Sequence, residues 1–281
     1  MTAAASIARR RSARRIPRGL ATGLLLLLAL LMLALRPDLL APYDPLTFDY
    51  GALLQPPSLA HPFGTDNFGR DVLSRVIWAT RIDLQIALFG TLFPLVFGTA
   101  VGAFVGYRGG WLDTVFGRIV DVVITFPFLV LVIAIIAVLG PGLFNMYIAV
   151  SSVGWVFYAR LMRSEILVQK QADYASAARI MGYSTSRILF RHLLPNAITP
   201  VIVFWMTDMA LVILLGASLG YLGLGALPPT PEWGLLVADG KNFMSTGWWM
   251  SMFPGAAVVI AGISFSLIGD GLADLLRPRG R

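Results

Sequence analysis

The chain has 281 residues, of which 57% are hydrophobic and 13% are charged. Globular proteins carry about 25% charged residues, and a soluble fold with so few charges would expose large apolar patches and aggregate. A disordered chain is also excluded, because such chains are polar and poor in aromatic residues. The composition therefore predicts a polytopic membrane protein.

Cysteine is absent, which excludes disulfides, thiol catalysis and thiolate metal sites. Only two histidines are present, His61 and His192, so no histidine metal centre is expected. The 22 basic and 15 acidic residues give a formal charge of +7. Because the basic residues mostly flank apolar stretches, this charge indicates membrane topology rather than nucleic-acid binding. We expect no metal and no cofactor bound by this chain.

Six apolar stretches predict six transmembrane helices, since a span takes about 20 residues. They cover residues 20–35, 84–106, 122–140, 143–159, 197–227 and 248–269. The stretches are continuously apolar and do not alternate, which excludes a β-barrel. Residues 39–41 can lengthen the first stretch, so the first helix is expected over 20–41 and the fold is expected to be all-α.

The positions of Lys and Arg predict the orientation, because cytoplasmic segments carry the excess of basic residues. The tail over 1–19 is rich in arginine and has no acid. If this tail is cytoplasmic, few basic residues fall outside: Arg36, Arg70, Arg75, Arg81 and Lys241. We therefore expect both termini in the cytoplasm.

This orientation makes residues 42–80 an extracytoplasmic loop and residues 81–281 a core of five helices. Proline is frequent in the loop, which predicts turns and extended chain. After Gly69, apolar residues fall at helical spacing: Val72, Leu73, Val76 and Ile77. They fit either an amphipathic helix at the outer interface or a connector into the second span.

The cytoplasmic segment over 160–196 contains two helix-prone pieces separated by Gly182. Ser184 or Thr185 can cap the second piece, and Pro195 is expected to end it. Small side chains precede the glycine in Tyr174-Ala175-Ser176-Ala177-Ala178. A helix–turn–helix with small residues at its elbow can insert into a cleft on another protein. The alternative is an ordinary basic loop that serves topology.

This segment resembles the inner-membrane permease subunits of ATP-binding-cassette importers, whose motif is E-A-A-x3-G-x9-I-x-L-P. The aligned residues are Ser176, Ala177, Ala178, Gly182, His192, Leu194 and Pro195. Ser176 replaces the glutamate and His192 the isoleucine, and the other five positions match.

Two further segments are similar to the dipeptide, oligopeptide and nickel branch of that family. Residues 61–75 resemble its H-P-x-G-T-D-x-x-G-R-D-x-x-S-R signature, and residues 106–113 resemble its G-Y-x-G-G-x-x-D segment. Over about residues 20–281, the order and spacing look like the second ("C") permease subunit of a dipeptide or oligopeptide importer.

The resemblance implies a type I importer permease fold in the bacterial inner membrane that forms half of a translocation pathway. The implied partners are a homologous permease in a heterodimer, two ATPase domains that bind ATP and Mg, and an extracytoplasmic substrate-binding protein. No catalysis by this chain is implied, and the sequence has no nucleotide-binding motif of its own. Coupling to the ATPases is assigned by resemblance to Tyr174, Ser176, Ala177, Ala178, Gly182, Leu194 and Pro195.

Glycines recur at every fourth position within two predicted spans, which is typical of closely packed membrane helices. They are Gly98, Gly102 and Gly106 in the second span, and Gly216 and Gly220 in the fifth. Asp208 also lies in the fifth span, where an ionisable group is costly unless it is paired or faces water. It fits a pathway residue that meets the amino end of a peptide, or one paired with a hydroxyl or cation of the partner subunit.

Several cargoes remain open at this point. The same importer class also handles nickel chelates, glutathione and haem. A more distant alternative is an ion-coupled secondary transporter, which predicts inverted repeats and paired midplane carboxylates. The sequence shows no such repeat, and the carboxylate of Asp208 stands alone in its span.

Overall fold

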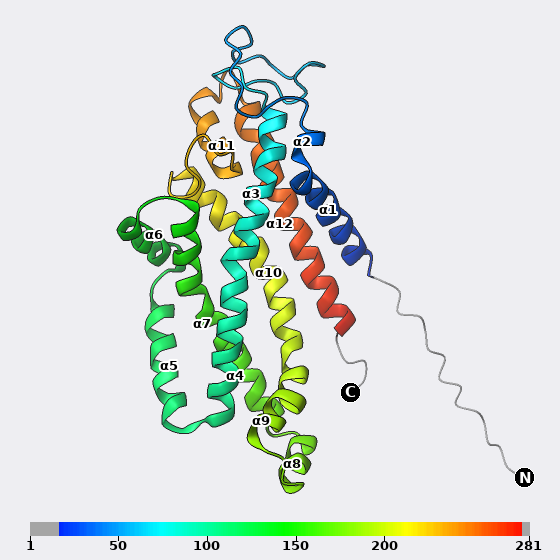
Figure 1. The fold of residues 1–281 in the computed structure, drawn as a ribbon, viewed down its shortest axis with the longest axis vertical. Coiled ribbons are helices and arrows are strands. Elements are labelled where there is room, and N and C mark those ends of the chain that lie inside the picture. Colours follow the sequence, from blue (N-terminus) through cyan, green and yellow to red (C-terminus); the bar gives the residue numbers. More distant parts are fainter. Residues whose placement is uncertain (1–16, 277–281) are drawn as a thin grey trace, which may run out of the picture.

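The computed structural model describes residues 17–276, and over this range the fold is helical, with one isolated bridge between Thr65 and Asp71 and no strand. The basic tail up to residue 16 and Arg277, Arg279 and Arg281 lie outside the described residues. Long helices run side by side along the molecule (Figure 1). The all-α prediction is confirmed for the described range.

The elements follow in chain order. The first half holds α1 (Arg18–Leu35), α2 (Pro37–Leu40), α3 (Val72–Phe93), the π-helical turn η1 (Pro94–Gly98), α4 (Thr99–Arg108), α5 (Gly110–Thr125) and α6 (Phe128–Leu139). The second half holds α7 (Leu143–Gln169), α8 (Asp173–Ile180), α9 (Thr185–Arg187), the π-helical turn η2 (Ile188–Leu193), α10 (Leu194–Tyr221), α11 (Trp233–Gly240), the 3-10 turn η3 (Lys241–Phe243) and α12 (Trp249–Leu276).

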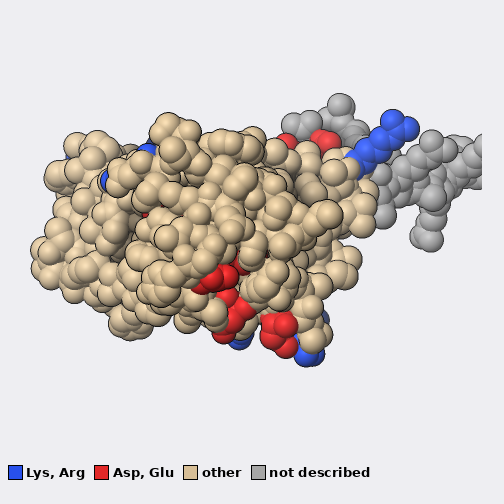
Figure 2. All heavy atoms as spheres, turned by 90° about the horizontal axis from the view of Figure 1, so that it is seen from above, with Lys and Arg blue, Asp and Glu red and all other residues tan. Residues whose placement is uncertain are grey.

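Two ends of the bundle carry the loops. We call the end with residues 41–71 and α11 the loop end, and the end with α8 and α9 the elbow end (Figure 1). Between them, α10 packs against α12 and α3, α4 packs against α7, and α1 packs against α12. Seen from the loop end, the surface is mostly uncharged, with acidic side chains close together at one edge (Figure 2).

Four helical segments in the described range are long and apolar enough to cross a membrane: Arg18–Leu35, Val72–Arg108, Thr185–Tyr221 and Trp249–Leu276. The bent pair α5 and α6 makes a fifth if it counts as one span. The chain is therefore a multi-pass membrane protein. The prediction of six spans exceeds this number, and α7 is the long helix outside the set.

The predicted span over 122–140 is bent in the structure. It is divided between α5 and α6, whose axes differ by 87°. The cause is Pro127, because a proline disfavours the helical conformation of the residue before it. Phe126 accordingly has extended backbone, with φ −83° and ψ 138°.

Two other prolines lie at π-helical turns, and Pro195 differs from the prediction that it ends a helix. Pro195 does not end a helix; it lies in the first turn of α10, directly after the π-helical turn η2. A proline lacks an N–H and clashes with the carbonyl four residues earlier. In a π-helical turn the carbonyls pair one residue further along, which lets the segment from Thr185 to Tyr221 continue as one helix. Pro94 opens the corresponding turn η1 between α3 and α4.

The boundaries of the first helix and the first loop also differ from those predicted. The helix expected over 20–41 ends at Leu35, because Arg36 leaves the helical region and pairs with Asp38 before the short α2. The loop expected over 42–80 ends nine residues early, since α3 begins at Val72 and runs unbroken to Phe93. The connector into the second span was the correct alternative for the apolar residues after Gly69.

The glycine stripes lie where neighbouring segments approach closely. A Cβ on Gly98 would overlap the carbonyl oxygen of Trp155, and one on Gly102 that of Ala159, both on α7. A Cβ on Gly106 would lie 2.9 Å from the Arg163 carbonyl oxygen. In α10, a Cβ on Gly216 would lie 2.7 Å from Ile86 of α3, and one on Gly220 would overlap the Glu232 carboxylate.

We predict that Gly102→Ala destabilises the purified chain by about 1–3 kcal/mol, because the new methyl group meets backbone that cannot move aside. Gly262→Ala is the matched control, since no atom of another segment lies within 4 Å of its Cβ position on α12. Alanine there is expected to be neutral or stabilising by roughly 0.5–1 kcal/mol. Thermal unfolding in detergent measures both, and equal midpoints for the two variants would contradict the close approach of α4 and α7.

Candidate functional site

The segment over 61–75 builds the loop end around a buried group of charges. The carboxylate of Asp66 accepts from the Arg70 Nε at 2.6 Å and from the Arg75 Nη1 at 2.8 Å. Asp239 of α11 lies 3.4 Å from the Arg75 guanidinium. Asp66, Arg70 and Arg75 are all buried. This network fixes the first loop to α3 and α11, which explains why the segment needs both acids and arginines at this spacing.

The same segment also starts α3. Asp71 caps the helix by accepting from the Ser74 backbone N–H at 2.7 Å, and its other carboxylate oxygen lies 3.0 Å from the His61 Nδ1. An acidic N-cap satisfies a free backbone donor and complements the positive end of the helix dipole. His61 is therefore used in holding the loop against the helix.

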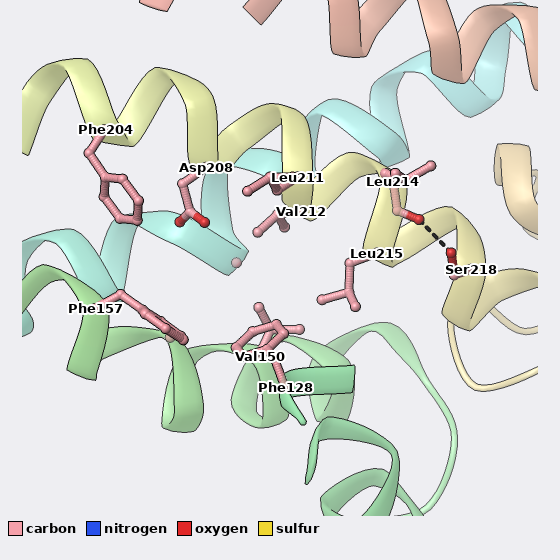
Figure 3. Close-up of a pocket in the computed structure, with 12 residues that line it drawn as sticks. Phe128, Val150, Phe157, Phe204, Asp208, Leu211, Val212, Leu214, Leu215 and Ser218 are labelled. Carbon is pink, nitrogen blue, oxygen red and sulfur yellow. Dashed lines mark hydrogen bonds between the residues drawn. The ribbon is translucent and has the colours of Figure 1, made fainter. Parts of the chain in front are cut away.

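A cavity of about 510 Å³ lies between α3, α6, α7 and α10. Figure 3 shows its mostly apolar lining, with aromatic rings from α6, α7 and α10 and aliphatic side chains from α10 directed into the same space. Its volume falls in the range of small-molecule binding pockets, about 300–1,000 Å³. Towards the loop end it adjoins a second hollow of about 360 Å³, which shares Leu214 and Ser218 with it and reaches Val237 on α11.

Asp208 is the ionisable residue that lines this cavity in the described range. The Tyr158 hydroxyl of α7 donates a hydrogen bond to its Oδ2 at 2.6 Å. The sequence left open a hydroxyl partner on another subunit, whereas the structure provides one from the same chain. Tyr158 is fully buried and Asp208 is half-buried, so the carboxylate keeps one face towards the cavity.

The elbow has an inner and an outer face. Ala175 and Ala178 are buried against apolar residues of α7, η2 and α10. Tyr174, Ser176 and Ala177 are exposed. The coupling residues proposed from the sequence are therefore divided: Ala178 supports the elbow from within, and Ser176 and Ala177 present its outer surface.

Gly182 makes the turn of the elbow with a φ of +74°, a conformation that favours glycine. Directly before it, the tip exposes two large apolar side chains, Ile180 at 87% and Met181 at 60% of their surface. Leu194 and Pro195 lie further along, half-buried and exposed at the start of α10 rather than at the tip.

Polar contacts from neighbouring helices hold the elbow in place. The Arg179 Nη2 donates to the Lys170 carbonyl at 2.7 Å, and the Lys170 Nζ donates to the Tyr107 carbonyl at 2.6 Å. The Arg163 Nη2 of α7 donates to the Asp113 Oδ2 of α5 at 2.6 Å. Residues 106–113, which the sequence singled out, thus form a support for the elbow.

The relatives of the chain identify its family. Residues 98–281 match the family described as "Binding-protein-dependent transport system inner membrane component". The dipeptide transport system permease protein DppC of Alkalihalophilus pseudofirmus is 38% identical over 257 residues, covering 92% of this chain and 84% of that protein. The chain belongs to this family of inner membrane transport components.

Two further relatives are similar over a comparable share of the chain. The glutathione transport system permease protein GsiD of Pectobacterium atrosepticum is 40% identical, covering 92% of this chain and 86% of that protein. The probable D,D-dipeptide transport system permease protein DdpC of Escherichia coli is 40% identical, covering 94% and 88%. The family prediction made from the motifs is confirmed.

Some residues of the site carry no sequence signal that would single them out. The tip residues Ile180 and Met181 appear in the sequence as part of an ordinary amphipathic helix. Tyr158 lies 50 positions before its partner Asp208. Only the fold brings the two side chains together, because no motif or spacing connects α7 with the middle of α10.

We predict that Asp66→Ala lowers the free energy of unfolding by about 3–5 kcal/mol, because it leaves Arg70 and Arg75 buried without their shared partner. Asp38→Ala is the matched control, since Asp38 pairs with Arg36 on the surface, where such a pair contributes about 0–1 kcal/mol. Thermal unfolding of the purified variants measures the difference. A loss for Asp66→Ala no larger than that of the control would contradict the buried network.

Proposed function

We propose that this chain is the permease subunit of an ATP-driven importer for small peptides and forms half of its translocation pathway. The observation that carries the proposal is the similarity over more than 90% of the chain to proteins named for dipeptide, D,D-dipeptide and glutathione transport. Glutathione is the second candidate cargo, favoured by the relative that is 40% identical.

The proposed assembly has four kinds of component. This chain pairs with a homologous permease, an extracytoplasmic binding protein delivers the peptide, and two ATPases supply the energy and bind ATP and Mg. The family description, which makes transport dependent on a binding protein, supports this arrangement. In it the chain catalyses no reaction and binds no cofactor.

The proposed topology has six spans in a bacterial inner membrane: α1, the segment of α3 and α4, the bent pair α5 and α6, α7, the segment ending in α10, and α12. The α7 helix qualifies because its first 17 residues, 143–159, carry no charge. An even number of spans returns the chain to the side where it began. Both termini and the elbow are then cytoplasmic, and the loop end faces outwards, in agreement with the basic tail over 1–19.

Asp208 is proposed to receive the amino end of a peptide. Its carboxylate has one hydrogen bond, from Tyr158, and borders the apolar cavity. A peptide ammonium group can occupy the remaining acceptor positions of a carboxylate. The apolar lining then accommodates side chains of differing size without polar requirements of its own.

We predict that Asp208→Asn reduces uptake of a dipeptide with a free amino terminus about tenfold, because a hydrogen bond to a charged group contributes roughly 1.5–3 kcal/mol. Uptake of the N-acetylated dipeptide should be unaffected by the substitution. Uptake by vesicles with the complete importer measures both. Ser218→Ala is the control, since that hydroxyl bonds to its own helix at Leu214. An equal loss for both peptides would contradict the role of Asp208 in substrate recognition.

For the elbow we predict that Met181→Asp separates the ATPases from the membrane subunits, because it introduces a charge into an apolar contact. Leu59→Asp is the matched control, since Leu59 is fully exposed at the loop end. The amount of ATPase that copurifies with the assembled complex should fall about tenfold for Met181→Asp and stay unchanged for Leu59→Asp. Undiminished ATPase binding and peptide-stimulated hydrolysis in Met181→Asp would contradict the coupling role.

Cysteine labelling in whole cells tests the orientation. The chain has no cysteine of its own, so only the introduced cysteine can react. An impermeant maleimide applied from outside should label Leu59→Cys and leave Ser176→Cys unlabelled, although both positions are exposed. Labelling of Ser176→Cys from outside would overturn the proposed topology.

A further inference from the structure

Two acidic side chains meet inside the loop end without a cation. Asp83 of α3 is 1% exposed and Glu232, at the start of α11, is fully buried. The two side chains lie within hydrogen-bonding reach of one another. Tyr147 of α7 lies close enough to Asp83 to interact with its charge, and among the described residues neither acid forms a salt bridge.

The backbone contacts of the pair are unequal. Glu232 caps α11 with both oxygens, accepting from the Gly234 N–H at 2.7 Å and the Leu235 N–H at 2.9 Å. Asp83 accepts one backbone hydrogen bond, from the Trp233 N–H to its Oδ2 at 3.0 Å. Two N–H donors at a helix N-terminus favour the ionised form of Glu232, so a proton on the pair belongs on Asp83.

The remaining oxygen of Asp83 supports this assignment. Its Oδ1 is buried and has no donor among the described residues. Two carboxylates cannot hydrogen bond to each other, whereas a carboxyl group donates one hydrogen bond to a carboxylate. Burial raises the pKa of the Glu232 carboxyl, so two negative charges on the pair are disfavoured. A single proton between the two side chains satisfies the unpaired oxygen and removes one buried charge.

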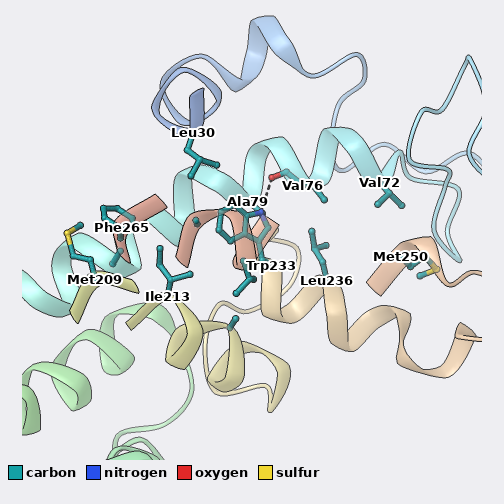
Figure 4. Packing of buried hydrophobic residues seen from close by; sticks show 14 of the residues in the cluster. Leu30, Val72, Val76, Ala79, Met209, Ile213, Trp233, Leu236, Met250 and Phe265 are labelled. Atoms are coloured by element: carbon teal, nitrogen blue, oxygen red, sulfur yellow. Dashed lines mark hydrogen bonds between the residues drawn. The ribbon is translucent and has the colours of Figure 1, made fainter. Parts of the chain in front are cut away.

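The pair lies at a point where α11 meets two other helices. The Glu232 carboxylate fills the space left by Gly220 of α10, and the Gly234 Cα approaches the carbonyl of Ala217. Trp233 is buried between α3, α11 and α12, and its indole N–H donates to the Val76 carbonyl at 3.1 Å (Figure 4). The pair therefore lies where α11 packs against α3 and α10.

We propose that Asp83 and Glu232 share one proton, and that the resulting carboxyl–carboxylate bridge positions α11 at the loop end of the cavity. Val237 of α11 lines the hollow that adjoins the main cavity, so a displacement of α11 changes the width of this opening. Loss of the proton at alkaline pH leaves two buried negative charges and releases the helix. The existence of the bridge is independent of the proposed function. Its importance for the opening of a translocation pathway rests on the proposed function.

The first test is infrared spectroscopy of the full-length chain in lipid vesicles. The difference spectrum between the natural chain and Asp83→Asn should contain the carbonyl band of a protonated carboxyl group at neutral pH. Glu232→Gln should also lose this band, because an amide can donate to an ionised Asp83. Asp38→Asn, a surface substitution, should keep it. A band that survives Asp83→Asn would overturn the shared proton.

The second test measures the position of α11 through the rate of maleimide labelling of Val237→Cys. Asp83→Ala should label about tenfold faster, the effect of losing one buried hydrogen bond. Asp83→Asn should label as slowly as the natural aspartate, because an amide also donates to Glu232 and accepts from Trp233. Labelling of every variant speeds up with pH because the thiolate is the reacting form, so the rates are compared at each pH. The ratio of the rate with Asp83 to the rate with Asp83→Asn should rise as the pH rises.

Each outcome decides the question. If Asp83→Asn labels as fast as Asp83→Ala, the contact does not depend on a donor at position 83. If all variants label at the same rate at each pH, the bridge does not position α11. Neither test requires transport, so failure of the bridge and failure of the proposed importer role can be distinguished.

Discussion

Hydrocarbon offers no hydrogen-bonding partner, so every polar group within a span must be satisfied by the chain itself. Helices satisfy the backbone N–H and C=O groups. At Pro94 and Pro195, which lack an N–H, the adjacent π-helical turns keep the neighbouring backbone hydrogen-bonded. The same requirement governs side chains, because Asp208 is paired with Tyr158 from another helix. At the loop end it extends to charges, where Asp66 is shared between two buried arginines.

Apolar surface gives membrane helices little reason to associate, since lipid tails are as apolar as the side chains. Close packing at small residues holds the helices together in place of the hydrophobic effect. Gly98 and Gly102 bring α7 against η1 and α4, and Gly216 brings α3 against α10. These contacts place the walls of the cavity, so the glycine stripes and the candidate pathway are parts of one arrangement.

Properties that depend on neighbouring residues could be predicted from the sequence, and those that depend on the fold could not. Continuous apolar stretches predicted helices, and the turn at Gly182 followed from local residue types. Pro127 marks in the sequence the position of the bend between α5 and α6. The bend angle of 87° depends on what these two helices pack against. The two faces of the elbow follow from a helix break at residues 170–172 that no residue there requires. Asp83 and Glu232, 149 positions apart, meet only through tertiary packing.

The elbow side of the molecule and the cavity are connected through α7. Near the elbow, Arg163 ties this helix to Asp113 of α5, and about one and a half turns away, on the scale of 3.6 residues per turn, Tyr158 ties it to Asp208 of α10. Between these contacts α7 has no break, and Gly98 and Gly102 hold it against its neighbours. A helix packed this tightly moves as a unit rather than bending. In the proposed coupling, α7 would carry a displacement from the elbow side to Asp208, which joins the proposed coupling surface to the cavity.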